Sequence, residues 1–253
     1  MSAPATAETR RVVVTGVGLL SPLGRSYAGV IGMLRSGASG VRAMPGWAQL
    51  GVRSLVAGVP GDAAEWRRSA PIPKELLFGM SDGALFAALA ALDAVHDAGL
   101  AADALKQPRC ACIVGNGSFG MATLAYEQAR QAMAGQARRI PPYTVLQCMS
   151  SSASAAVANL FGVLGPSYSI AAACASSAHC IGHALQLLRA GVVDIALAGG
   201  AEELDGLIAA SFEGMRHTLS TAFNDTPERA SRPFDAARDG LVLGGGGGIV
   251  VLE

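Results

Sequence analysis

Charged side chains are scarce in this sequence, and neither sign prevails. Asp, Glu, Lys and Arg make up 15% of the 253 residues, and 19 basic residues balance 19 acidic ones. Typical soluble domains carry roughly 25% charged residues. A nucleic-acid-binding domain needs a basic surface, and disordered chains usually carry a net charge. The composition therefore predicts a folded chain without a nucleic-acid partner.

Charge is missing altogether from one long stretch. Between Ile140 and Leu188 there is no Asp, Glu, Lys or Arg. A membrane span is excluded because Asn159, a run of three serines from Ser150 and three prolines interrupt the stretch, leaving no apolar window of about 20 residues. The stretch is therefore expected to lie in a dense core or in a permanent interface between subunits.

Cysteines and aromatic residues are also few. Five cysteines, an odd number in apolar settings, fit reduced thiols and a cytoplasmic location. Cys110 and Cys112 point to one face of a predicted strand and are interpreted as packing residues. Aromatics make up 5%, whereas the 32 glycines show no collagen-like period, which favours tight turns and close packing. No export signal is expected, because glycines and Pro22 interrupt the apolar run after Arg10 and Arg11.

The hydrophobic pattern predicts alternating strands and helices. Short apolar runs predict strands over 11–15, 109–114, 168–173 and 193–198. Helical spacing predicts helices over 27–35 and 81–98, the second beginning at an N-cap serine and ending at a glycine.

A third helix is predicted from Ser176 or Ser177, whose hydroxyl groups can cap it, to Arg189. It joins the strands predicted at 168–173 and 193–198 in a β-α-β unit. Such a unit places parallel strands in a sheet whose two faces are both covered, so the fold class is α/β.

Cys174 lies where a predicted strand turns into this helix. The unpaired amides and the positive end of a helix dipole favour the thiolate, which is the nucleophilic form of cysteine. Its neighbours Ala173, Ala175, Ser176 and Ser177 are small, so a substrate can approach the sulfur and backbone amides can hold a developing oxyanion. Composition alone favours the alternative, a buried structural cysteine, because free cysteine is among the most buried residue types.

Three other patterns match ligand sites only in part. His179 and His183 lie on one helical face, but no acidic ligand is near, so hydrogen-bonded core histidines are favoured over a metal site. The run from Gly16 to Gly18 lacks the third glycine and the distant acidic residue of a dinucleotide fingerprint. The glycines at 244–248 lack the Lys-Ser/Thr pair of a phosphate-binding loop, so they are interpreted as backbone that passes very close to another segment.

The residues around Cys174 resemble those of a known family. The segment from Ser169 to Gly182 is similar to the nucleophile segment of the β-ketoacyl-ACP synthases, which are condensing enzymes with a thiolase-like fold. Family-like segments also lie at 11–18, 194–203, 224–227 and 232–240. The resemblance covers nearly the whole chain. It implies an α/β thiolase-like fold, a mixed or parallel sheet layered with helices, with residues 1–253 forming the N-terminal domain or half of that fold.

The resemblance implies that Cys174 is the catalytic residue of an acyltransferase. In that family this cysteine takes an acyl group from acyl carrier protein as a thioester, and decarboxylation of malonyl-ACP supplies the carbanion that attacks it in fatty acid or polyketide elongation. The run at 244–248 is similar to the ketoacyl-ACP synthase I branch. The positions that correspond to the family's acyl pocket are Ser118, Met149, Ala173 and Phe212. Met149 is expected to reach the pocket of a partner subunit.

The resemblance also implies partners. Acyl carrier protein brings the substrates on its phosphopantetheine, so no free cofactor and no metal are expected. Its acidic surface is expected to meet a thin basic patch of Lys74, Arg138 and Arg139. The charge-free stretch fits a homodimer, or a heterodimer with a ketosynthase-like subunit, that shares the acyl site. No membrane span is expected.

Two interpretations stay open at this point. The family's two catalytic histidines, its lysine and a second oxyanion amide come from a second half, and none of the four histidines of this sequence matches them. The chain is either the N-terminal half of a β-ketoacyl-ACP synthase that needs the second half or a partner chain, or an incomplete partner subunit resembling the chain-length factors of type II polyketide or polyene systems. Cys174 favours the first, because such subunits often lack it, and the short length favours the second. A thiol hydrolase is disfavoured, since no histidine is predicted near Cys174.

Overall fold

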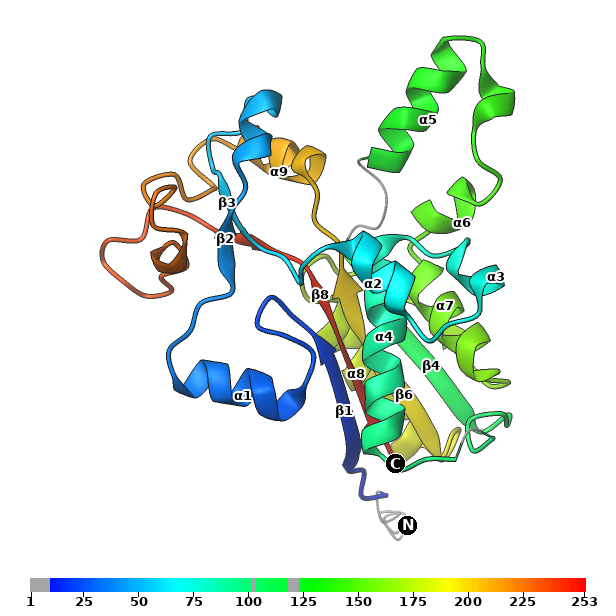
Figure 1. Ribbon diagram of the computed structural model, residues 1–253. Coiled ribbons are helices and arrows are strands. Elements are labelled where there is room, and N and C mark those ends of the chain that lie inside the picture. Colours follow the sequence, from blue (N-terminus) through cyan, green and yellow to red (C-terminus); the bar gives the residue numbers. More distant parts are fainter. Residues whose placement is uncertain (1–9, 102, 118–122) are drawn as a thin grey trace, which may run out of the picture.

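A five-stranded mixed sheet forms the centre of the molecule (Figure 1). The computed structural model describes residues 10–101, 103–117 and 123–253. The strands of the sheet are β1 (Val14–Leu20), β4 (Cys110–Gly115), β5 (Ser167–Tyr168), β6 (Ile195–Glu202) and β8 (Gly246–Leu252). They lie in the order β1-β8-β6-β4-β5, where β4 is parallel to β5 and β6, and β8 is antiparallel to β1 and β6.

Helices cover both faces of this sheet (Figure 1). Helices α4 (Asp82–Asp97) and α7 (Ser152–Phe161) pack on one face, and α8 (Ser176–Arg189) packs on the other. This arrangement confirms the predicted α/β fold class, a mixed sheet layered with helices.

The alternation of side chains along β4 separates the two layers. Cys110, Cys112 and Val114 join the core with α4 and α7, whereas Ala111 and Ile113 join the core with α8. Both cysteines are fully buried, which confirms their predicted packing role, and burial raises the pKa of the Cys110 thiol to about 12. These thiols therefore stay protonated and unreactive near neutral pH.

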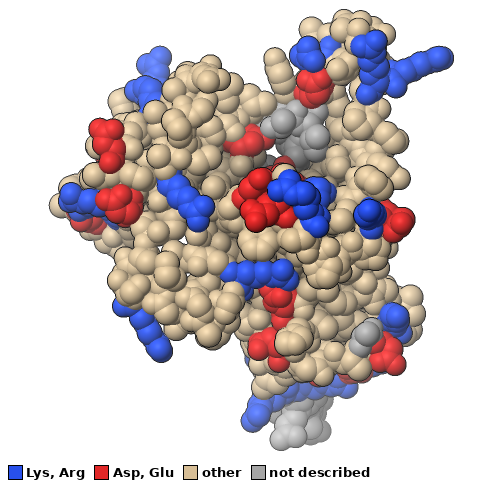
Figure 2. Space-filling model, in the orientation of Figure 1, with Lys and Arg blue, Asp and Glu red and all other residues tan. Residues whose placement is uncertain are grey.

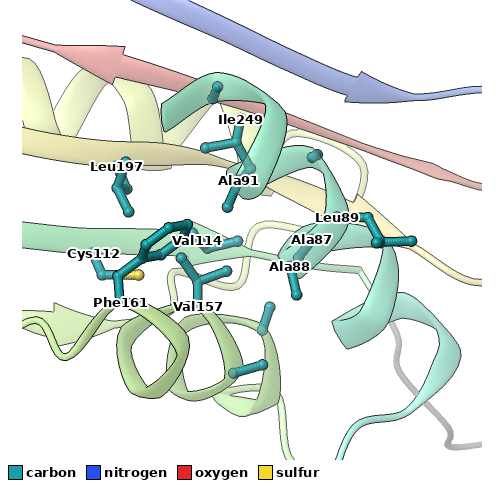
Figure 3. Packing of buried hydrophobic residues seen from close by; sticks show 14 of the residues in the cluster. Ala87, Ala88, Leu89, Ala91, Cys112, Val114, Val157, Phe161, Leu197 and Ile249 are labelled. Carbon is teal, nitrogen blue, oxygen red and sulfur yellow. The ribbon is translucent and has the colours of Figure 1, made fainter. Parts of the chain in front are cut away.

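The larger core lies between the sheet and the α4–α7 layer (Figure 3). Helix α4 contributes mainly small side chains to it, among them Ala87, Ala88 and Ala91, and these let the helix lie close to the strands. Larger side chains fill the remaining space from α7 and from the sheet, including Val157, Phe161, Leu197 and Ile249.

A smaller lobe packs beside the main sheet. Its three-stranded sheet has the order β2 (Val41–Ala43), β3 (Val56–Gly58), β7 (Leu243–Gly244). The 3-10 helix η1 (Pro45–Leu50) and α9 (Gly206–Glu213) contribute to a separate core around Trp47. The remaining helical segments are α1 (Tyr27–Arg35), α2 (Ala63–Ser69), α3 (Lys74–Leu77), α5 (Thr123–Met133), α6 (Thr144–Cys148), η2 (Ala137–Arg139) and η3 (Pro227–Arg229). None of the helices among the described residues is long and apolar enough to cross a bilayer.

The predicted helices agree with the structure, but the predicted opening strand does not. Helix α1 has the predicted bounds, and Ser81 caps α4 by accepting the amide of Ala84 at 3.2 Å. The first strand was expected at 11–15 and instead runs to Leu20, because Gly16 and Gly18 continue it rather than end it. A Cβ at Gly18 would lie 1.9 Å from the carbonyl oxygen of Ala90, so these glycines let β1 lie directly against α4.

The prediction of a strand over 168–173 is also wrong in its extent, because the observed strand, β5, is Ser167–Tyr168. Only Ser167 and Tyr168 pair with β4, at the exposed edge of the sheet, and the chain then leaves the sheet to form the turn that carries Cys174. The predicted β-α-β unit is present, since α8 joins β5 to β6 and both are parallel to β4. However, β4 lies between them, so the crossover spans one strand.

The charge-free stretch is divided between core and surface. Helix α7 is largely buried, which confirms the predicted dense core for that part. In contrast, the apolar side chains of Val145, Leu146 and Met149, in and just after α6, are about half exposed or more. A subunit interface over this surface stays a prediction.

Asp239 closes the loop that precedes β7. Its carboxylate accepts hydrogen bonds from Ser220 Oγ at 2.6 Å and from the amides of Thr221 and Ala222 at 2.7 Å. Partial burial raises the pKa of Asp239, but these hydrogen bonds outweigh it and hold the pKa below its usual value.

This loop is expected to open in acid. Because the folded-state pKa lies below the unfolded value of about 3.9, the stabilisation is present above that value and is lost as pH falls through the folded pKa. Hydrogen exchange should show protected amides at Thr221 and Ala222 near neutral pH and lost protection well below pH ~4. Asp239→Ala, which removes the oxygen that accepts both amides, should lose this protection at both pH values. If the two amides stayed equally protected in strong acid, the ionised Asp239 carboxylate would not be the group that protects them.

Candidate active site

Cys174 lies on the turn between β5 and α8, and its side chain is exposed. The helix begins at Ser176, and its N-cap position is Ala175, which makes no side-chain capping bond. The expectation that Ser176 or Ser177 caps the helix is therefore wrong. The reason is that the Ser176 hydroxyl is engaged with the turn itself.

A cavity of about 340 Å³ opens over Cys174. It lies where β1, β4 and β6, which run in the same direction, reach their carboxyl ends and where the antiparallel β8 begins. This edge is where α/β sheets usually bind ligands. The lining residues are Leu20, Ser21, residues 115–117, Ala173, Cys174, Ser176, Ser177, and residues 200–202 and 245–248.

Glycines let the Cys174 turn and the first turn of α8 approach the sheet. A Cβ at Gly115 would lie 2.5 Å from the carbonyl oxygen of Ile170, and one at Gly200 would lie 2.9 Å from Cβ of Ser177. On the opposite wall, a Cβ at Gly247 would lie 2.7 Å from the carbonyl oxygen of Phe86. The prediction that the glycine run passes very close to another segment is therefore confirmed for Gly247, which lies against α4, and for Gly246, where a Cβ would lie 2.5 Å from the carbonyl oxygen of Leu20.

The backbone next to Cys174 adopts an uncommon conformation. Ala173 has φ +49°, in the left-handed region that residues other than glycine rarely occupy. The hydroxyl of Ser176 accepts the amide N–H of Ala172 at 2.8 Å, and its own hydrogen can reach the carbonyl oxygens of Ala173 at 2.7 Å and Asn116 at 3.0 Å. The turn is thus closed by a buried side chain as well as by its backbone.

Two residues of this cavity were not singled out from the sequence for a role. Glu202, at the end of β6, accepts the amide N–H of Gly117 at 2.7 Å and joins the ends of β6 and β4. The side chain of Asn116 is buried and donates to the carbonyl oxygen of Ser150 at 2.6 Å. The available signal was that Asn116 lies two residues after the strand predicted at 109–114 and Glu202 four residues after the strand predicted at 193–198, which does not reveal the groups that they contact.

The structure brings one of the predicted acyl-pocket residues beside Cys174. Ala173 lines the same cavity. Met149, which follows α6 and is 46% exposed, and Phe212 of α9, which is half-buried, are not among the described residues of its lining. Ser118 lies outside the described residues. The acyl-pocket roles of these four residues stay predictions.

The predicted basic patch is spread over two elements. Lys74 begins α3 and lines a separate hollow of about 840 Å³ beside α2 and the start of α4. Helix α5 and the following η2 form an arm that projects from the rest of the molecule (Figure 1). Arg138 and Arg139 lie in η2 and are exposed. Figure 2 shows Lys and Arg side chains at the tip of this arm. Their role in binding a partner stays a prediction.

The two histidines of α8 lie on its outer side, away from the sheet core. His183 Nε2 lies 2.6 Å from the hydroxyl of Tyr168, and His179 is exposed. Both line one shallow hollow, so their predicted common face is confirmed, but the prediction that they are core histidines is wrong for His179. The part of the chain that the structure describes holds no group of three or more potential metal ligands.

Comparison with known proteins gives consistent matches over almost the whole chain. The family described as "Beta-ketoacyl synthase, N-terminal domain" matches residues 9–253. The 3-oxoacyl-[acyl-carrier-protein] synthase 1 of Haemophilus influenzae is 40% identical over 248 aligned residues, and the alignment covers 96% of this chain and 59% of that protein. A solved β-ketoacyl synthase from Burkholderia phymatum superposes with a TM-score of 0.88 at 31% identity, over 96% of this chain and 59% of that one.

A second solved structure, the ishigamide ketosynthase/chain length factor, superposes with a TM-score of 0.82 at 29% identity, over 97% of this chain and 58% of that one. The chain therefore spans less than two thirds of the length of the proteins it matches.

Proposed function

Because the chain belongs to the β-ketoacyl synthase family, we propose that it carries the acyl-accepting site of a β-ketoacyl-[acyl-carrier-protein] synthase, with Cys174 as the nucleophile. The observation that carries the proposal is the exposed Cys174 beside the N-terminus of α8, inside a cavity walled by glycine backbone. Few side chains obstruct the approach of an acyl group to the sulfur.

The first step is acyl transfer. The sulfur of Cys174 attacks the carbonyl carbon of an acyl thioester on carrier protein, and backbone amides of the turn stabilise the developing oxyanion. The bond to the phosphopantetheine sulfur breaks, that sulfur leaves as a thiolate and takes up a proton, and the acyl group remains on Cys174 as a new thioester.

The second step is a decarboxylative condensation. Malonyl-ACP loses carbon dioxide, its carbanion attacks the acyl carbonyl, and the Cys174 sulfur leaves as β-ketoacyl-ACP forms. The described lining of the cavity includes no histidine or lysine. We place the groups that assist decarboxylation in a second half-domain or a partner chain.

Two partner surfaces belong to the same proposal. Carrier protein would approach over Lys74, Arg138 and Arg139, and Met149 would reach a dimer partner.

A second candidate is a catalytically incomplete partner subunit similar to a chain-length factor. The likeness to a ketosynthase/chain length factor structure supports it. The two candidates differ in whether Cys174 takes up an acyl group, because a scaffold subunit needs no nucleophile.

Acyl labelling tests the proposal. The intact protein is incubated with acyl-ACP and digested with chymotrypsin, which can cleave after Phe161 and Tyr168 and so separate Cys148 from Cys174. The peptides are analysed by mass spectrometry with and without hydroxylamine, which cleaves thioesters. We expect a hydroxylamine-sensitive acyl mass on the peptide that contains Cys174 and none on the peptide that contains the half-buried Cys148. The absence of an adduct at Cys174 in the presence of the natural partner chain would contradict the enzyme proposal. It would favour the second candidate, the catalytically incomplete partner subunit.

A further inference from the structure

We infer that Ser176 and Asn116 are positioning residues for Cys174, and that they join its turn to the turn between α6 and α7. Neither side chain needs to touch the acyl group in this role. The inference uses the Cys174 nucleophile of the proposed function, but it rests on the hydrogen bonds of the turn and is tested without acyl transfer.

The first step of the argument is the strain in the turn. A left-handed conformation is unfavourable for a residue other than glycine, because its Cβ comes too close to the following carbonyl oxygen. Such a conformation persists only where the surroundings hold it, and it is common at sites of function. Ala173, at φ +49°, directly precedes Cys174, so its conformation helps to set the direction in which the Cys174 side chain leaves the backbone.

The second step is what holds Ala173 in place. The amides of Ala175 and Ser176 donate to the carbonyl oxygens of Ala172 and Ala173, both at 3.1 Å, which closes the turn through the backbone. The hydroxyl of Ser176 adds a clamp from inside the turn, because it accepts the Ala172 amide and can donate to the Ala173 carbonyl. Ser176 is 2% exposed, so water cannot readily replace these bonds.

The third step links the turn to its neighbours. The Ser176 hydroxyl can share its one hydrogen between the carbonyl oxygen of Ala173 and that of Asn116, which follows β4 and lies 3.0 Å away. The Asn116 side chain, 4% exposed, donates to the carbonyl oxygen of Ser150 at 2.6 Å. Ser150 directly follows Met149, so the chain of hydrogen bonds runs from the α6–α7 turn, through the end of β4, to the turn that carries Cys174.

Alkylation of Cys174 by iodoacetamide tests this clamp, since it reports on the thiol whether or not the protein transfers acyl groups. Without the Ser176 hydroxyl, Ala173 can relax and the sulfur can move away from the α8 N-terminus. Ser176→Ala should therefore slow alkylation about threefold or more at fixed pH. Ser176→Thr, which keeps the hydroxyl, should react at close to the wild-type rate.

A matched control removes another buried serine hydroxyl. Ser220 is fully buried and bonds to Asp239, outside the described lining of the cavity. Ser220→Ala should leave Cys174 alkylation unchanged even where it lowers the unfolding midpoint. Wild-type alkylation in Ser176→Ala, or an equal slowing in Ser220→Ala, would overturn the inference.

A double-variant cycle tests the link through Asn116. Asn116→Leu removes the donor to Ser150 at similar side-chain volume and should also slow alkylation. If both residues act on one turn, the double variant should be no slower than the slower single variant, because effects within one network are not additive. Independent, multiplying effects would overturn the joint role.

Acyl transfer gives a second readout that a purely structural role would not move. In Ser176→Ala the maximal rate of acyl uptake should fall about tenfold or more, with little change in the half-saturating acyl-ACP concentration, because transfer depends on orientation. If wild-type protein takes up no acyl group, the proposed function fails, and the alkylation rates still decide the positioning role.

Discussion

Cys174→Ala is expected to abolish acyl uptake, with a loss of about 10³-fold or more, because no other described residue of the cavity offers a sulfur nucleophile. Cys174→Ser should be nearly as inactive, since a serine hydroxyl without an adjacent base is a far weaker nucleophile. The measurement is the rate of acyl loss from acyl-ACP together with the mass of the protein adduct.

The control for this loss of acyl uptake is the stability of the variant, which shows whether it is still folded. Cys174 is exposed, so its replacement should change the free energy of unfolding by no more than about 0.5 kcal/mol. Cys148→Ser should retain full acyl uptake. An acyl adduct that persists elsewhere in Cys174→Ala would contradict the assignment of the nucleophile.

Gly18→Ala is expected to destabilise the protein by about 3 kcal/mol or more. The added Cβ would lie 1.9 Å from the carbonyl oxygen of Ala90 and 2.4 Å from the amide nitrogen of Ala94, so β1 and α4 must separate. Both atoms belong to the backbone of a buried helix, and a side-chain rotation cannot relieve the contact. Urea unfolding followed by circular dichroism measures the loss.

Gly248→Ala is the matched control for this substitution. Gly248 lies in β8 opposite Leu19, one position from the partner of Gly18, and a Cβ there meets no atom within 4 Å. It should change the free energy of unfolding by less than about 1 kcal/mol. If Gly18→Ala were as mild as Gly248→Ala, the close packing of β1 on α4 would not be the reason for the glycine.

Local patterns predicted the helices well because their causes are local. The spacing of apolar residues and the serine before α4 predicted that helix, and the small residues around Cys174 indicated an accessible thiol near a helix start. The strands were harder. β1 was placed too early because its glycines look like breaks, and the last residues of the predicted third strand leave the sheet to form the Cys174 turn.

The sequence by itself determined the α/β pattern, the position of Cys174 before α8, the packing role of Cys110 and Cys112, and the family. These depend on the order and periodicity of neighbouring residues. Only the tertiary structure decided that the ends of β1, β4 and β6 and the glycine run of β8 form one cavity. It also decided that Ser176 clamps its turn rather than capping its helix. The physical reason is that these contacts join segments far apart in the chain, whose meeting depends on strand order and close backbone packing rather than on any local pattern.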